Sequence, residues 1–256
     1  MTRPVRYECE ETDPRQVRDA RSDFIYDPAR SPLMRHSRDD RGYRRIATID
    51  IETTHFEPAR GETVSIGLAV HDRGTPSSTV TYELFHRDGD GERALIERAM
   101  EHLDGLDADV LVSYGGRGFD VEFLRERSAN LGGTFRSPAL DTPDTHVDLF
   151  EARKAIANRR GRKWPKLEEC LESYGCAPAT TVWGERTVTN VRFGEELGPA
   201  YLETLKADDT DRLSGLIDVI EHYLTSDLEA NLTLYYADIG EEFSPRHLGN
   251  VSTFDA

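Results

Sequence analysis

Apolar residues along the chain first alternate with polar ones and later recur with a helical period. Residues 46–52, Ile-Ala-Thr-Ile-Asp-Ile-Glu, are mostly β-branched or apolar and follow a charged stretch, which predicts a strand. Residues 63–70 and 79–86 have the same character, and the Gly-Thr-Pro-Ser-Ser sequence at 74–78 is typical of a turn. These three segments predict an antiparallel meander.

Helical periodicity begins after this meander. Residues 92–103 place apolar side chains on one helical face, which predicts an amphipathic helix. Residues 110–114 form an apolar run typical of a buried strand, and the glycine-rich stretch 115–118 separates it from a second predicted helix at 119–131. The order β-β-β-α-β-α predicts an α/β fold, a mixed sheet with three antiparallel strands first and helices on its faces.

The second half of the chain is predicted to be largely helical from residue 147 onward. Helices are expected at 149–157, at 166–174 and at 210–239, the last as one element or two. Residues 176–210 mix Pro, Gly and scattered aromatic residues and predict no defined element.

The polar pattern also suggests domain limits. Residues 1–43 are charged and contain four scattered prolines, so we expect an N-terminal arm with little core of its own, in which 23–26 offer an edge strand for docking. Residues 44–240 are expected to form one domain, followed by a C-terminal tail at 241–256.

Charge and composition add a hypothesis about the environment. The formal net charge is −16, and only four of the 32 basic residues are lysine. Abundant carboxylates with scarce lysine suggest a cytoplasm of high salt, where charge repulsion is screened. Full stability in low salt would count against this hypothesis.

Cysteine usage and hydropathy indicate an intracellular location. Cys9, Cys170 and Cys176 form no Cys-x-x-Cys pair, so a disulfide framework or a zinc site is not expected. The sequence shows no apolar run of about 20 residues and no signal-peptide core. We therefore expect a cytoplasmic protein with no membrane partner.

The first candidate for chemistry is a pair of carboxylates on the opening strand. Side chains two apart on a strand share a face, so Asp50 and Glu52 point the same way while Ala47, Ile49 and Ile51 point the other way. Two such carboxylates repel each other, and a divalent cation would relieve the repulsion. The alternative is an ordinary strand that ends in solvent, because Asp-x-Glu is a common sequence.

Two further carboxylates occupy predicted helices. Asp120 follows the glycine-rich turn at a helix start, where an ordinary N-terminal cap is the alternative. Asp227 follows Tyr223 at i+4, which places both on one helical face beside the apolar stripe. A half-buried carboxylate there is costly unless it is paired or binds a metal. His146 and Asp148 are expected to have structural roles, and the role of His222 stays open.

These motifs together resemble a known family. Asp50-x-Glu52, Phe119-Asp120 and Tyr223-x-x-x-Asp227 are similar to the three motifs of the Asp-Glu-Asp-Asp 3′–5′ exonucleases, in the tyrosine-containing branch of the ribonuclease H-like superfamily. The resemblance spans residues 44–238. One departure is Gly115, five residues before Asp120, where members of the family often carry Asn.

The resemblance implies a mechanism. Asp50, Glu52, Asp120 and Asp227 would hold two Mg²⁺ or Mn²⁺ ions, which clamp an in-line displacement at phosphorus. Asp50 would bridge both ions, Glu52 would contact the 3′ hydroxyl, and Tyr223 would orient the attacking water. Substrates would be 3′ ends of single-stranded DNA or RNA. A structure-selective endonuclease and a catalytically silent nucleic-acid-binding module are the alternatives.

Two basic stretches offer contacts to a polyanion. Between residues 153 and 166, seven of fourteen residues are basic and none is acidic. We predict that this stretch grips the phosphate backbone, with a tryptophan available for stacking, through Arg153, Lys154, Arg159, Arg160, Arg162, Lys163, Trp164 and Lys166. A solvated loop is the alternative. Five arginines between residues 35 and 45 form either a solvated linker or a phosphate-contacting arm.

Overall fold

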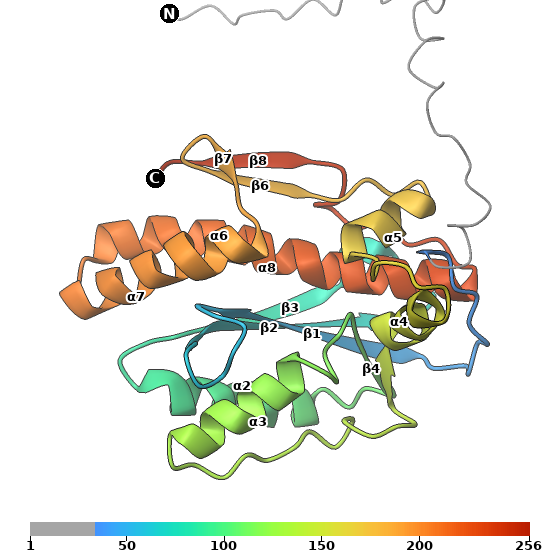
Figure 1. Ribbon diagram of the computed structural model, residues 1–256, viewed down its shortest axis with the longest axis horizontal. Coiled ribbons are helices and arrows are strands. Elements are labelled where there is room, and N and C mark those ends of the chain that lie inside the picture. Colours follow the sequence, from blue (N-terminus) through green and yellow to red (C-terminus); the bar gives the residue numbers. More distant parts are fainter. Residues whose placement is uncertain (1–33) are drawn as a thin grey trace, which may run out of the picture.

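The computed structural model describes residues 34–256, in which a five-stranded mixed sheet is the central element (Figure 1). Its strands are β1 (Arg45–Thr53), β2 (Thr63–Asp72), β3 (Thr81–His86), β4 (Val110–Ser113) and β5 (His146–Asp148), in the spatial order β3-β2-β1-β4-β5. β1, β2 and β3 pair antiparallel, whereas β4 and β5 continue the sheet in parallel from β1. The predicted α/β architecture is confirmed.

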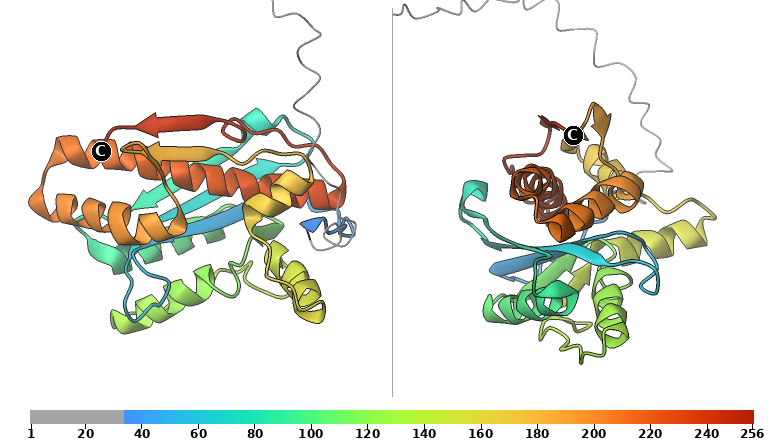
Figure 2. Two further views of the ribbon diagram at one scale, coloured as in Figure 1. Left: turned by 45° about the horizontal axis from the view of Figure 1, so that its top comes forward. Right: turned by 90° about the vertical axis from the view of Figure 1, so that its left-hand side faces the viewer.

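Helices cover both faces of this sheet (Figures 1 and 2). α2 (Gly91–Gly105) and α3 (Asp120–Asn130) lie on one face, and the long helix α8 (Thr210–Ile239) crosses the other. α7 (Gly198–Ala207) runs beside the first half of α8. α4 (Leu149–Arg159) and α5 (Leu167–Ser173) pack near its second half.

Strand β1 sends alternate side chains into the two helical layers. Ala47, Ile49 and Ile51 are buried in the apolar core that includes residues of α2 and α3. Ile46 is buried in the opposite core, with residues of α8. Asp50 and Glu52 lie four and six residues after Ile46, and side chains an even number of residues apart on a strand share one face. The pleat of β1 therefore directs both carboxylates toward α8, as it does Ile46.

Helix α8 is one continuous helix of 30 residues. It starts after Asp209, whose side chain accepts a hydrogen bond from the Arg212 amide, and it ends at Gly240 in a left-handed conformation. The helix lies close to the sheet at Gly67: a Cβ there would be 2.7 Å from Leu224 Cγ and 2.9 Å from Leu228 Cδ1. Glycine at this position therefore sets how closely α8 approaches β1 and β2.

Several elements of the second half were not predicted. β5 lies directly before the helix predicted at 149–157 and was itself not predicted, because a strand of three residues leaves too little alternation to recognise. No element was predicted for residues 176–210. They contain β6 (Thr180–Trp183), β7 (Arg186–Thr187), the short helix α6 (Asn190–Arg192), the π-helix η2 (Phe193–Leu197) and α7. A 3₁₀ turn, η1 (Ser77–Thr79), precedes β3.

The chain end also forms structure. β8 (Val251–Phe254) pairs in parallel with β6 and completes a second sheet of order β7-β6-β8 over α8, so these residues are more than an extended tail (Figure 1). Most of the proposed N-terminal arm, including the possible edge strand at 23–26, lies outside the described residues. Within residues 34–256, no helix is both long enough and apolar enough to cross a bilayer.

Candidate active site

The carboxylates of β1 meet that of α8 beside the sheet. Asp50 lies opposite Gly67 in the β1–β2 register, and Glu52 lies opposite Ser65 just before a register shift at Thr53. One oxygen from each of Asp50, Glu52 and Asp227 lies within 4.8 Å of the other two. Glu52 is buried, and the other two carboxylates are partly buried. Residues far apart in the sequence thus form one acidic cluster.

Asp120 reaches the same region from the start of α3. It is the first residue of this helix and is only 6% exposed. Its Oδ2 would lie 3.0 Å from a Cβ at position 116, so glycine there gives the carboxylate room. The charge of Asp120 acts on both Asp50 and Glu52. The structure therefore brings Asp50, Glu52 and Asp227 together, and Asp120 acts on them through its charge from outside this group of three.

Gly115 has a backbone reason for being glycine. Its φ of +92° lies in the left-handed region, which glycine tolerates best and asparagine better than most other residues. Its amide donates a 2.9 Å hydrogen bond to Asp148 Oδ1. The turn that carries Asp120 is therefore fixed by main-chain geometry, and the absence of a side-chain amide does not disturb it.

Burial and mutual repulsion make these carboxylates hard to ionise. Burial, with the charges of Asp148 and Asp227, raises the pKa of Asp120 to about 8. Burial and the charge of Glu168 raise the pKa of Asp227 to about 7. For Asp50 and Glu52, burial is the main cause and the negative charges of the neighbouring carboxylates are the second. Together they raise the pKa of each group well above its ordinary value. The free cluster holds protons that ordinary carboxyl groups lose near pH 4.

The donor set fits a hard divalent cation. Carboxylate oxygens are the ligands that Mg²⁺ and Mn²⁺ favour, and three of them converge within 4.8 Å. A cation would also remove the repulsion that raises the pKa values of these groups. Asp50, Glu52 and Asp227 would hold it, and Asp120 lies next to them.

The stability of the metal-free protein should depend on pH through this cluster. A carboxyl group whose pKa is raised by folding binds its proton more tightly in the folded state, so its contribution to stability is complete below about pH 4 and is lost as the pH rises through the folded-state pKa. From the values of about 7 for Asp227 and about 8 for Asp120, the loss should extend from about pH 4 to pH 8. Urea unfolding in EDTA across this range measures it, and Asp120→Asn should flatten the curve. An unchanged slope in that variant would contradict the assignment.

Tyr223 lies one helical turn before Asp227 and faces the same cluster. Its ring stacks on Phe193, with centroids 5.9 Å apart, and its hydroxyl donates a 2.7 Å hydrogen bond to Asn190 Oδ1. Burial, with the charges of Asp227, Glu52 and Asp50, raises the pKa of Tyr223 well above its ordinary value. The phenol therefore stays neutral and can orient a water molecule but cannot act as a strong base.

The sequence did not identify two neighbours of the cluster, Asn190 and Glu168, and it assigned a structural role to a third, Asp148. Asn190 and Glu168 lie in segments with no catalytic motif, so nothing in the local sequence pointed to them. The Asp148 carboxylate accepts from the amides of Gly115, Arg117 and Phe150, which caps α4 and fixes the loop before Asp120. Its structural role agrees with the sequence prediction.

The predicted nucleic-acid contact of Arg153 is wrong. This side chain is 0% exposed, and its guanidinium binds the buried Asp238 carboxylate at 2.6 and 2.9 Å. The geometry is that of a bidentate internal ion pair joining α4 to α8. A run of basic residues does not reveal that its first member, on the inner face of a helix, is buried.

The rest of the basic stretch is more accessible. The basic residues from the last position of α4 onward are exposed, namely Arg159, Arg160, Arg162, Lys163 and Lys166. Trp164 is 47% exposed, although its Nε1 donates to Asn158 Oδ1 and the Lys154 ammonium lies 4.5 Å from its ring centroid. The stretch from 159 to 166 is called the basic segment below, and its contact with nucleic acid stays a prediction.

Comparisons with known proteins bear on the family of this chain. A family model described as the RNase_H superfamily matches residues 47–236. No curated protein matches the chain. A family B DNA polymerase from the hyperthermophilic archaeon Pyrobaculum calidifontis is 20% identical over 77% of this chain and 27% of its own, with a TM-score of 0.44. E. coli exonuclease I, solved with single-stranded DNA and zinc, is 16% identical over 51% of this chain and 35% of its own, with a TM-score of 0.38.

The chain thus spans about a quarter to a third of the length of these two solved structures. The family model, in contrast, runs from within β1 to within α8 and includes Asp50, Glu52, Asp120 and Asp227. Because this match covers most of the sequence, the chain belongs to the RNase_H superfamily.

Proposed function

We propose that this protein is a metal-dependent 3′–5′ exonuclease that hydrolyses phosphodiester bonds of single-stranded DNA or RNA. The observation that carries the proposal is the convergence of Asp50, Glu52 and Asp227 within 4.8 Å, with Asp120 beside them. Membership of the RNase_H superfamily supports nuclease activity. The 3′ polarity rests on the resemblance of the motifs to those of Asp-Glu-Asp-Asp exonucleases.

Bound Mg²⁺ or Mn²⁺ would supply activation of water and neutralisation of charge at the scissile phosphate. The four carboxylates would hold the cations, with Asp50 central because the charges of the other three all act on it. Tyr223 would place the attacking water. Because its own proton is donated to Asn190, its oxygen is left to accept a hydrogen bond from that water.

The direct test uses purified protein with Mn²⁺ or Mg²⁺ and single strands of DNA and RNA labelled at the 5′ end. A 3′–5′ exonuclease shortens such strands stepwise and releases mononucleotides. Internal fragments would favour a structure-selective endonuclease. Binding without cleavage, in both metals and at both low and high salt, would favour a silent nucleic-acid-binding module.

The Tyr223–Asn190 pair gives a prediction about the chemical step. Tyr223→Phe should lower kcat about tenfold to hundredfold, because the attacking water loses its orienting group. Asn190→Ala should lower kcat by a smaller factor without changing KM, and it should have no further effect when Tyr223 is already Phe. Asn190→Asp is the control, since it keeps an oxygen acceptor for the hydroxyl. An equal loss from Asn190→Ala in both backgrounds would show that Asn190 does not act through Tyr223.

The basic segment gives a prediction about binding. Reversing the charge of Arg159, Arg162 and Lys163 to Glu should weaken single-strand binding at least about tenfold and reduce its dependence on salt, because fewer counterions are released. Fluorescence anisotropy at several salt concentrations measures both effects.

The matched control for this experiment changes the net charge equally at exposed positions outside the segment. Arg93, Arg136 and Lys206 are exposed residues of this kind. If both triple variants bind equally, only the overall charge matters and the basic segment is not a contact surface.

A further inference from the structure

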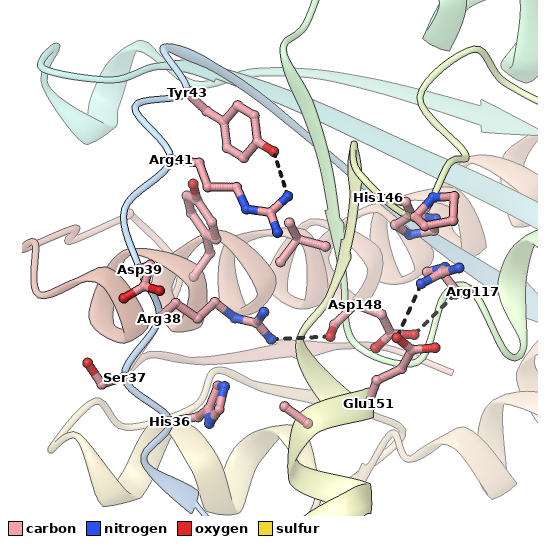
Figure 3. A pocket seen from close by; sticks show the side chains of 14 residues that line it. His36, Ser37, Arg38, Asp39, Arg41, Tyr43, Arg117, His146, Asp148 and Glu151 are labelled. Atoms are coloured by element: carbon pink, nitrogen blue, oxygen red, sulfur yellow. Dashed lines mark hydrogen bonds and ion pairs between the residues drawn. The ribbon is translucent and has the colours of Figure 1, made fainter.

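A polar cavity of about 580 Å³ lies at the β5 edge of the central sheet (Figure 3). One wall is the extended segment 36–43, and the opposite wall is formed by β5 and the first turn of α4. Its volume is within the usual range for small-molecule sites, which is about 300–1,000 Å³. The sequence left the arginines of this segment open as part of a solvated linker or of a phosphate-contacting arm.

The segment is held in place by bonds that are independent of any ligand. The Arg38 amide donates to the Asp238 carbonyl at 2.9 Å. The Asp40 carboxylate accepts two hydrogen bonds from Arg73, at 2.8 and 2.7 Å. The Tyr43 hydroxyl donates to the Asp144 carbonyl at 2.8 Å. The wall is therefore preformed, which lowers the ordering cost of binding.

This wall carries a partly buried cation, Arg38, whose side chain is 20% exposed and whose Nη2 donates to the neutral Asp148 carbonyl at 3.2 Å. Asp238 gives both carboxylate oxygens to Arg153, at 2.6 and 2.9 Å, and Arg38 Nε reaches it only at 3.5 Å. The Arg38 Nε is buried and has no hydrogen-bond partner among the residues that the structure describes. Burial and the charge of Arg153 lower the pKa of Arg38. Two guanidiniums thus share one carboxylate, and the surplus positive charge lies at the cavity.

A second guanidinium faces the same space. Arg41 points from the segment toward β5 in Figure 3. Among the residues that the structure describes, it donates to two neutral oxygens, the backbone carbonyl of Asp144 at 3.2 Å and the Tyr43 hydroxyl at 3.5 Å. Among the acidic groups that line the cavity, Glu151 is paired with Arg117, and Asp148 is occupied by three backbone amides. Asp39 is the remaining carboxylate, and it is exposed. The centre of the cavity is accordingly suited to an anion.

The cavity adjoins the carboxylate cluster. Arg117, which lines it, lies three residues before Asp120, and Asp148 on the opposite wall acts electrostatically on Asp120. Tyr43 also lines the cavity and is partly exposed, so its ring offers apolar surface to a base. A single strand of nucleic acid at the active site could therefore place one of its phosphates in this cavity.

We propose that this cavity binds a nucleotide, with its phosphate group on Arg38 and Arg41. The nucleotide is either one unit of the substrate strand or the released mononucleotide. This proposal rests on the proposed function for the origin of the ligand, and the binding itself requires no cleavage.

The test measures binding in EDTA, where the acidic cluster repels anions and cleavage is absent. Inorganic phosphate, a nucleoside 5′-monophosphate and a short single strand are titrated separately into the full-length protein by calorimetry. We expect the monophosphate to bind more tightly than phosphate. Tighter binding of the strand indicates a substrate unit, and equal or weaker binding indicates the product. Equal binding of phosphate and monophosphate would overturn the assignment to a nucleotide.

The variants locate the site. Arg41→Gln changes an exposed side chain and should weaken monophosphate binding about tenfold or more, the loss expected for a charged hydrogen bond. Asp39→Asn should strengthen it, because a repelling charge is removed. Arg136→Gln is a control outside the cavity. Unchanged affinity in Arg41→Gln, or a loss that occurs only in the Arg159, Arg162 and Lys163 triple variant, would overturn the proposal.

Failure of this inference can be told apart from failure of the proposed function. If strands are cleaved but the monophosphate does not bind in EDTA, only the cavity assignment is wrong. If the monophosphate binds in an Arg41-dependent manner but no strand is cleaved, the cavity assignment holds and the nuclease proposal is wrong.

Discussion

Asp50→Asn should abolish nuclease activity and, at the same time, stabilise the metal-free protein. Asp50 is the carboxylate on which the charges of Asp227, Asp120 and Glu52 all act. Replacing it removes a metal ligand, which should lower the cleavage rate at least about a thousandfold. The same change removes a repelling charge from a buried cluster. The free energy of unfolding in EDTA at pH 8 should therefore rise by about 1.4 kcal/mol or more, the equivalent of one pKa unit.

Opposite signs for activity and stability distinguish a functional carboxylate from a structural one. Cleavage assays and urea unfolding on the same preparation measure both quantities, and added Mn²⁺ should stabilise the wild type much more than the variant. Glu83→Gln, on the exposed face of the edge strand β3, is the control and should change neither quantity. If Asp50→Asn instead loses stability along with activity, the carboxylate supports the fold, and the proposed metal site is falsified.

The acidic residues were predictable because each belongs to a short local pattern. Alternation on β1 fixed the shared face of Asp50 and Glu52, and the i, i+4 spacing placed Tyr223 and Asp227 on one helical face. The order of strands and helices then indicated the sheet. Each of these patterns extends over only a few residues, so it can be recognised in a single sequence.

The remaining features depend on contacts between distant segments, which local patterns do not encode. Arg153 was taken for a surface residue because its partner Asp238 lies 85 residues further along the chain. Asn190 follows β7 in a segment without periodicity, and only the folded chain brings it to Tyr223. Strands β5 and β7 have three and two residues, too few for alternation to be recognised.

The approach of α8 to the sheet is another such long-range feature, and substitution of Gly67 should show that the active site depends on it. A Cβ at this position would lie 2.7 Å from Leu224 Cγ, and Leu224 and Leu228 flank Asp227 on α8. Gly67→Val must therefore push the helix away from β1, at a cost of about 3 kcal/mol of stability, the upper end of overpacking effects. Because Asp50 lies directly opposite Gly67, the separation between Asp227 and Asp50 should increase and the cleavage rate should fall about a hundredfold.

Two companion variants separate this effect from a general disturbance of α8. Gly215 lies on the same helix, and a Cβ added there would have no neighbouring atom within 4 Å, so Gly215→Ala should stabilise the protein by about 1 kcal/mol and leave cleavage unchanged. Leu224→Ala makes room opposite Gly67, so in the milder Gly67→Ala background it should restore part of the lost activity, although each single variant is less stable than the wild type. Thermal unfolding and cleavage rates of the four proteins in this double-mutant cycle measure the coupling. Purely additive losses would mean that Gly67 does not set the distance between α8 and β1, and that the carboxylates are brought together by other contacts.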